Sequence, residues 1–230
     1  MAAAALTTGS AILFEAGLSF LGLGDANRMS WGLIIGQNKN YLLDAWWTVA
    51  APGFAIFLTV LAISLIGEAL PIVVGNGNDV AARESMALAS YMAGIAFSNA
   101  GLGLCHAMSH QIGAAYGVPH GVANAIMLPS VMHYNQLVCK KRYPEIGLAL
   151  SGRMMDSAET IQCVQQLIIE IDLPANLIEA GARKEDFARF AEDALKDPCL
   201  ASNPRTAGKD QIIGVFQHAY HRPGREARRA

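Results

Sequence analysis

The stretch Gly101–Gly121 holds three of the six histidines in this chain of 230 residues. His106 and His110 are four residues apart, a spacing that places both imidazoles on one face of a helix, one turn apart. The segment Gly117–Pro119 ends that helix, and His120 follows where a second helix can begin. The sequence therefore predicts two helices joined by a tight turn, with three imidazoles converging on one point.

A cluster of imidazoles is a candidate metal site, because imidazole suits Zn, Fe, Cu and Ni. The alternative is that these histidines are buried and donate to backbone carbonyls, as single histidines in protein cores commonly do. The spacing does not select one metal, and it does not decide whether His106, His110 and His120 are all ligands.

Several short motifs around the histidines resemble one known family, the iron-containing alcohol dehydrogenases, also called group III metal-dependent alcohol dehydrogenases. The resemblance covers about residues 70 to 220. The motifs that carry it are MALAS at Met86–Ser90, AFSNAGLG at Ala96–Gly103, PHG at Pro119–Gly121, DPC at Asp197–Cys199 and NPR at Asn203–Arg205.

This resemblance implies a metal-dependent oxidoreductase that interconverts small alcohols and aldehydes with NAD(P). It implies that His106 and His120 are two ligands of a catalytic Fe²⁺ or Zn²⁺. It places His110 beside the nicotinamide, as a catalytic proton-relay group or as a partner of the metal ligands.

The chain departs from the family pattern in one respect that concerns the metal. The family binds its metal with one Asp and three His, and the Asp and first His come from an upstream D-x-x-x-H motif. No histidine precedes His106 here, and the Gly-rich nucleotide-binding domain is not found, so no cofactor-binding residue is assigned. We therefore expect weak metal binding and no dehydrogenase activity from the chain as it stands.

The composition points to a membrane segment. Hydrophobic residues make up 53% of the chain, charged residues 16%, and the mean hydropathy is +0.29. The stretch Ala45–Gly67 carries no charge and is long enough to cross a hydrocarbon core of roughly 30 Å. Trp46 and Trp47 suit the headgroup interface. The net charge of −2 gives no electrostatic case for a nucleic-acid partner.

The first part of the chain resembles a second family, the permease subunits of dipeptide/oligopeptide ABC transporters. The resemblance covers about residues 3 to 69 and implies the last two transmembrane helices of such a subunit. It also implies contact with membrane lipid through residues 1–69 and a location in the inner or plasma membrane; without insertion the chain is expected to be cytoplasmic. The matching stretches are Ser19–Gly24, Ser30–Gly32, Asn40–Leu43, Trp46–Trp47 and Pro52–Ala62.

These observations predict an all-α chain in three parts. Residues 1–69 are expected to form two apolar, transmembrane-type helices. Residues 70–221 are expected to form a helical bundle like the C-terminal domain of iron-dependent alcohol dehydrogenases, and residues 222–230 a solvated basic tail. No linker separates the first two parts near Gly67–Pro71, which favours a gene join, a deletion or an assembly error. Three functions stay open: a dehydrogenase fragment, a permease fragment, or no activity. A homo-oligomer is compatible with each of them.

Helices within the predicted bundle follow from periodicity and capping. Asp79 is placed to cap a helix over Val80–Ala100, and apolar residues recur at helical spacing over Ser157–Ile171. Two further helices are expected over Lys184–Leu195 and Lys209–Tyr220.

Overall fold

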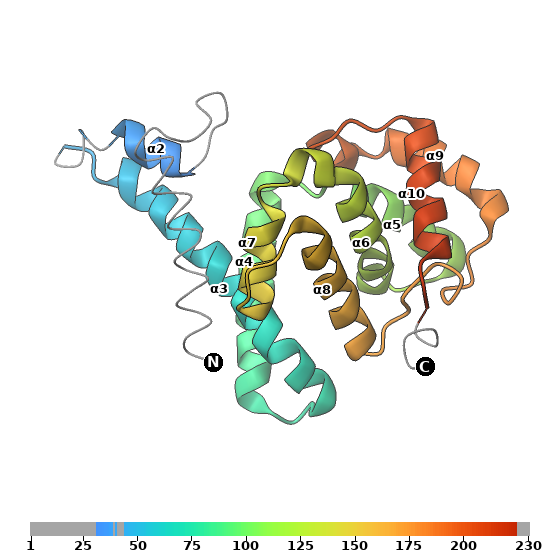
Figure 1. Cartoon of the computed structure of the whole chain (residues 1–230), viewed down its shortest axis with the longest axis horizontal. Coiled ribbons are helices and arrows are strands. Elements are labelled where there is room, and N and C mark those ends of the chain that lie inside the picture. The colour runs from blue at the N-terminus through green and yellow to red at the C-terminus, as the bar shows by residue number, and fades with distance from the viewer. Residues whose placement is uncertain (1–30, 39, 41–43, 225–230) are drawn as a thin grey trace. The chain divides into compact units, whose positions relative to one another are not determined.

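Helices are the regular elements of the described chain, which comprises residues 31–38, 40 and 44–224 of the computed structural model. No strand occurs within these residues, so the predicted all-α class is confirmed. The first predicted apolar segment, Met1–Asp25, and residues 225–230 lie outside them. The helices are α2 (Trp31–Asn38), α3 (Trp47–Gly75), α4 (Val80–Ala100), α5 (Gly103–Tyr116), α6 (His120–Cys139), α7 (Tyr143–Ser151), α8 (Ser157–Glu170), η2 (Lys184–Asp186), α9 (Phe187–Lys196), η3 (Pro198–Ser202) and α10 (Lys209–His221) (Figure 1).

Local capping explains where two of these helices begin. Asp79 Oδ1 accepts a hydrogen bond from the backbone N–H of Ala82 at 2.9 Å, so the predicted cap of α4 is confirmed. At α8, Asp156 accepts from the backbone of Glu159 while the Glu159 side chain accepts from the backbone of Asp156, each at 2.8 Å. This reciprocal pair satisfies two backbone donors that a helix start leaves without intrahelical partners.

The long apolar helix α3 extends beyond the predicted end at Gly67 and continues to Gly75. Its segment Leu58–Gly75 is long and apolar enough to span a membrane, with a mean hydropathy of 2.1, and only 11% of that segment is buried. The helix also runs without a break through Gly67–Pro71, where the sequence predicts the junction of two parts. The backbone at the predicted junction is therefore continuous helix, with neither a turn nor a linker.

The chain divides into two compact units that are not separated at residue 70. The first unit comprises residues 1–96 and 144–155, and the second comprises residues 97–143 and 156–230. In the first unit, a Cβ atom at Gly67 would clash with the backbone carbonyl of Leu150, so α3 and α7 approach closely there. The predicted division into residues 1–69, 70–221 and 222–230 stays a prediction.

The second unit has a dense apolar core between α5, α6, α9 and α10 (Figure 1). Leu104, Met108 and Ile112 on one face of α5 are fully buried, and Phe187 and Phe216 stack with ring centroids 5.3 Å apart. Burying one side chain of this size contributes about 1.5–3 kcal/mol. Because the core fixes one face of α5, the half-exposed face that carries the histidines is held in a defined position.

Arg222 corrects one part of the predicted tail. Its side chain is only 7% exposed and donates to the backbone carbonyls of Ala175 and Ile126 and to the hydroxyl of Ser130. Its own carbonyl accepts from Asn176. We expected residue 222 to begin a solvated end, but its buried side chain joins the end of α10 to α6. The carbonyl and hydroxyl oxygens around it supply the hydrogen-bond acceptors that a buried guanidinium requires.

Candidate metal centre

The start of the histidine helix is capped from a distant part of the chain. Ser202 Oγ accepts from the backbone N–H of Gly103 at 3.0 Å, and Asn203 Oδ1 accepts from that of Leu104 at 3.2 Å. Gly101 has a positive φ of 82°, and a Cβ atom there would clash with the Ser202 side chain. These contacts fix the first turn of α5 against the end of η3 and the residue that follows it.

The Asn-Pro-Arg motif connects this segment to α6. Asn203 and Asn135 form a reciprocal pair of amide hydrogen bonds, each 3.0 Å long. Arg205 donates to the carbonyl of Tyr134 at 2.7 Å and lies 4.1 Å from the centre of its ring. The motif therefore joins α5, α6 and the loop after η3, a structural role that the sequence does not reveal.

The structure brings the three predicted histidines together. The ring centroids of His106 and His120 are 5.2 Å apart, those of His110 and His120 5.4 Å, and those of His106 and His110 6.1 Å. The helix, turn and second helix expected from the sequence are therefore confirmed. Their nitrogen atoms, however, do not form a group with metal-ligand spacing within the described residues. The assignment of His106 and His120 as metal ligands stays a prediction.

His106 has the properties of a neutral nitrogen donor. Burial lowers its pKa below the ordinary 6.5, and the neighbouring His120 and His110 lower it further. The Leu102 carbonyl and the Asp197 carboxylate act in the opposite direction and do not outweigh them. Its Nδ1 atom is buried and makes no hydrogen bond of good geometry with the described residues. A neutral imidazole with an unshared electron pair can bind a cation.

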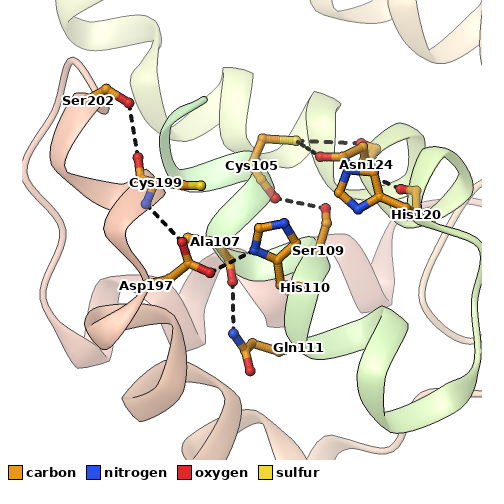
Figure 2. Close-up of polar contacts among 10 residues, drawn as sticks. All are labelled: Cys105, Ala107, Ser109, His110, Gln111, His120, Asn124, Asp197, Cys199 and Ser202. Carbon is orange, nitrogen blue, oxygen red and sulfur yellow. Dashed lines mark hydrogen bonds and ion pairs between the residues drawn. The ribbon is translucent and has the colours of Figure 1, made fainter. Parts of the chain in front are cut away.

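His120 is the first residue of α6, directly after Pro119. Its Nε2 lies 3.1 Å from Nδ2 of Asn124, and the same amide nitrogen donates to the His120 carbonyl at 3.0 Å (Figure 2). The amide thereby orients the ring. It also occupies the electron pair of Nε2, so a cation there would have to displace the amide.

His110 is paired with the carboxylate of Asp197, a residue that the sequence indicates only as part of the motif Asp197–Cys199. Its Nδ1 lies 2.7 Å from Oδ2 of Asp197, and the other oxygen of Asp197 accepts from the backbone N–H of Cys199 at 2.8 Å (Figure 2). The His110 side chain is 40% exposed and that of Asp197 11%. The pairing links residues separated by 87 positions, and no local sequence signal indicates it.

The charge of Asp197 decides which nitrogen of His110 carries the proton. Burial tends to raise the pKa of Asp197, but hydrogen bonds from His110 and Cys199 outweigh burial and hold it below the ordinary 3.8. An ionised carboxylate only accepts hydrogen bonds, so Nδ1 of His110 must donate. In the neutral ring Nε2 is then left as an acceptor.

Comparison with protein families matches residues 42–220 to the Fe-containing alcohol dehydrogenase family, C-terminal. The probable alcohol dehydrogenase EutG of Escherichia coli is 48% identical over 179 residues, which is 78% of this chain and 45% of the relative. The chain thus spans less than half the length of the curated relatives it matches.

Two solved structures share the fold of this chain over part of their length. One is a 1,3-propanediol oxidoreductase, with a TM-score of 0.69 and 36% identity over 73% of this chain and 45% of that chain. The other is an alcohol dehydrogenase from Oenococcus oeni, with a TM-score of 0.69 and 36% identity over 74% of this chain and 45% of that chain. The helical architecture predicted for residues 70–221 agrees with both.

The comparisons also correct the extent of the first resemblance. The family match begins at residue 42, so it includes 42–69, which we assigned to a permease fragment. None of these comparisons supports a fused permease. The permease interpretation rests on short stretches within residues 3–69, and the uncharged run in α3 adds to it because such runs are typical of transmembrane helices.

Proposed function

This chain belongs to the Fe-containing alcohol dehydrogenase family, and we propose that it forms the metal-holding half of an NAD(P)-linked alcohol dehydrogenase acting on small alcohols or aldehydes. The observation that carries the proposal is the cluster of three imidazoles at the junction of α5 and α6, all within 6.1 Å of one another. The similarity to alcohol dehydrogenases over this region supports the reaction class.

We propose that His106 and His120 hold the divalent metal, Fe²⁺ or Zn²⁺. The donor chemistry fits such an ion in part: His106 is neutral with an unsatisfied buried nitrogen, and the His120 ring lies 5.2 Å from it, centroid to centroid. When bound, the ion supplies Lewis acidity that lowers the pKa of an alcohol oxygen. The residues of α5 and α6 orient the two rings, and the lowered pKa of His106 favours the neutral form that a cation requires.

His110 is suited to take up the proton that an alcohol loses on oxidation. Asp197 accepts from Nδ1 of His110, which leaves Nε2 of the neutral ring as the acceptor. The side chain of His110 is 40% exposed, so a proton held on Nε2 can pass to solvent. This is one of the two roles that the resemblance implies for His110, and the Asp197 carboxylate orients the ring for it.

The described residues provide only part of a metal shell. Among them, neither His106 nor His120 belongs to a group of three donors with metal-ligand spacing. We propose that the 230-residue chain binds Fe²⁺ weakly and does not oxidise alcohols on its own, because two imidazoles hold a cation less tightly than a full set of four ligands.

A chimera tests the proposal directly. Residues 70–220 replace the corresponding region of E. coli EutG, and iron content and NAD(P)-dependent oxidation of small alcohols are measured. We expect the chimera to bind iron and to be active, and H106A and H120A to lose both. The matched control is H133A, which removes a histidine elsewhere on α6. A folded chimera without iron, or unchanged iron in H106A, contradicts the proposal.

A second candidate, membrane association, is favoured by the exposure of α3. Trp46, Trp47 and Phe54 are 61%, 56% and 61% exposed at one end of this helix, and most of Leu58–Gly75 is unburied. A long apolar surface of this kind requires a partner of similar polarity. We propose that lipid covers it. A permease origin rests on the sequence resemblance alone and, because the family match begins at residue 42, concerns only residues 3–41.

A further inference from the structure

A second cluster of donor atoms shares His110 with the three-histidine cluster but does not include His106 or His120. Donor atoms of His110, Asp197 and Cys199 all lie within 4.8 Å of one another. Figure 2 shows Asp197 between the other two, hydrogen bonded to the ring of His110 and to the backbone of Cys199. We propose that these three side chains form a separate site for a thiophilic divalent cation such as Zn²⁺. This inference does not depend on the proposed dehydrogenase function.

The three donors form a ligand set that zinc uses. Thiolate sulfur, imidazole nitrogen and carboxylate oxygen bind Zn²⁺ at about 2.0–2.3 Å, which places tetrahedral ligand atoms roughly 3.5 Å apart. The group observed here needs only small side-chain rotations to reach that separation. His110 and Asp197, now in hydrogen-bond contact at 2.7 Å, must move slightly apart to admit the cation.

The backbone holds all three donors in place before any cation arrives. Asp197 caps η3 through the N–H of Cys199, so these two residues have a fixed relative geometry. The segment that follows caps α5 through Ser202 and Asn203, which fixes the helix that carries His110. A site that is positioned in this way loses little conformational entropy when a cation binds.

The protons balance without any further reactant. In the cation-free protein, burial raises the pKa of Cys199, and the adjacent Asp197 raises it further, so the sulfur carries a proton. Binding breaks this S–H bond, forms the metal–sulfur bond and releases one proton to solvent. The proton that Nδ1 of His110 directs at Asp197 moves to Nε2 as Nδ1 takes the cation. No electron is transferred.

Cobalt distinguishes this site from the three-histidine cluster. Co²⁺ bound by a thiolate gives an intense charge-transfer band in the near ultraviolet, whereas Co²⁺ bound by imidazoles alone does not. The full chain is titrated with CoCl₂ in detergent with a non-thiol reductant. We expect the band to saturate at one Co²⁺ per chain and C199S to abolish it. D197N and H110A should weaken Co²⁺ binding by about 10- to 100-fold or more.

Two control variants assign the band. In C105S, the other thiol of this region is removed; its sulfur lies 3.5 Å from Asn124 Oδ1 on the His120 side. In H106A, the proposed catalytic ligand is removed. Both should keep the band, and loss in C105S instead of C199S overturns the proposal. So does the absence of a band in the wild-type chain at saturating Co²⁺.

A second measurement covers the case in which a variant does not fold. The wild-type chain is treated with iodoacetamide with and without ZnCl₂, and each cysteine is quantified by peptide mass spectrometry. We expect Zn²⁺ to slow alkylation of Cys199 by about tenfold or more while Cys139 and Cys163 are unaffected. Equal alkylation of Cys199 with and without Zn²⁺ overturns the proposal.

Discussion

Two helices of this chain, α3 and α5, differ in how far the protein covers their apolar residues. Both are rich in apolar residues, but Leu104, Met108 and Ile112 of α5 are fully buried while most of α3 from Leu58 to Gly75 is not. The buried face of α5 leaves its other face free to present histidines. The surface of α3 is largely apolar, and we propose that lipid covers it.

The largest expected effect is on membrane binding, and it comes from placing charged residues in α3. We expect the wild-type chain to float with phospholipid vesicles in a density gradient and the double variant Leu61→Lys, Leu65→Lys to stay with the soluble fraction. Each lysine near the centre of an inserted helix costs about 3 kcal/mol. Leu137→Lys, at an exposed leucine of α6, is the matched control and should still float. A wild-type chain that stays monomeric without detergent contradicts lipid association.

The next test compares how much stability is lost when one apolar side chain on each helix is truncated to alanine. Leu104→Ala should lower the free energy of unfolding by about 2–5 kcal/mol, because it leaves a cavity under the histidine face of α5. Ile72→Ala, at a residue of α3 that is 48% exposed, should change it by less than about 1 kcal/mol. Urea unfolding followed by circular dichroism in the same detergent measures both. Equal losses would show that α3 is packed as tightly as α5.

The sequence predicts the local features of the fold and of the candidate site, but not the contacts between distant residues. The spacing of His106, His110 and His120 predicts their clustering because a helix and a proline-initiated helix are local structures. The pairing of His110 with Asp197, and the capping of α5 by Ser202 and Asn203, join positions far apart in the chain. The burial of Arg222 is likewise set by tertiary contacts, while its basic neighbours predict a solvated end.

Removing the cap of α5 should cause a smaller loss of stability. Asn203→Ala removes the acceptor for Leu104 N–H and both amide bonds with Asn135, so we expect a loss of about 1–3 kcal/mol in unfolding free energy. Asn135→Ala alone should cost less, since the cap of α5 remains. In the double variant the two losses should be less than additive. Strict additivity would mean that the amide pair does not form.

The smallest expected effect is on the pH dependence of stability, in the unit that contains α5. Burial lowers the pKa of His218 below 6.5, and His133, stacked 4.7 Å away, and Arg222 lower it further. The unfolded chain therefore binds this proton more readily, and stability should decrease as the pH falls from 6.5 through the folded-state pKa. His218→Gln should reduce that decrease. The denaturant midpoint of both proteins from about pH 7 to pH 5 measures it, and identical slopes contradict the assignment.

We propose above that the α5–α6 junction holds the catalytic metal. An anomalous difference map, recorded at the iron absorption edge from crystals of the EutG chimera loaded with Fe²⁺, tests it most directly. We expect one strong peak within about 2.1 Å of a ring nitrogen of both His106 and His120. A peak confined to His133 and His218, or no peak in crystals of an iron-saturated protein, would contradict it.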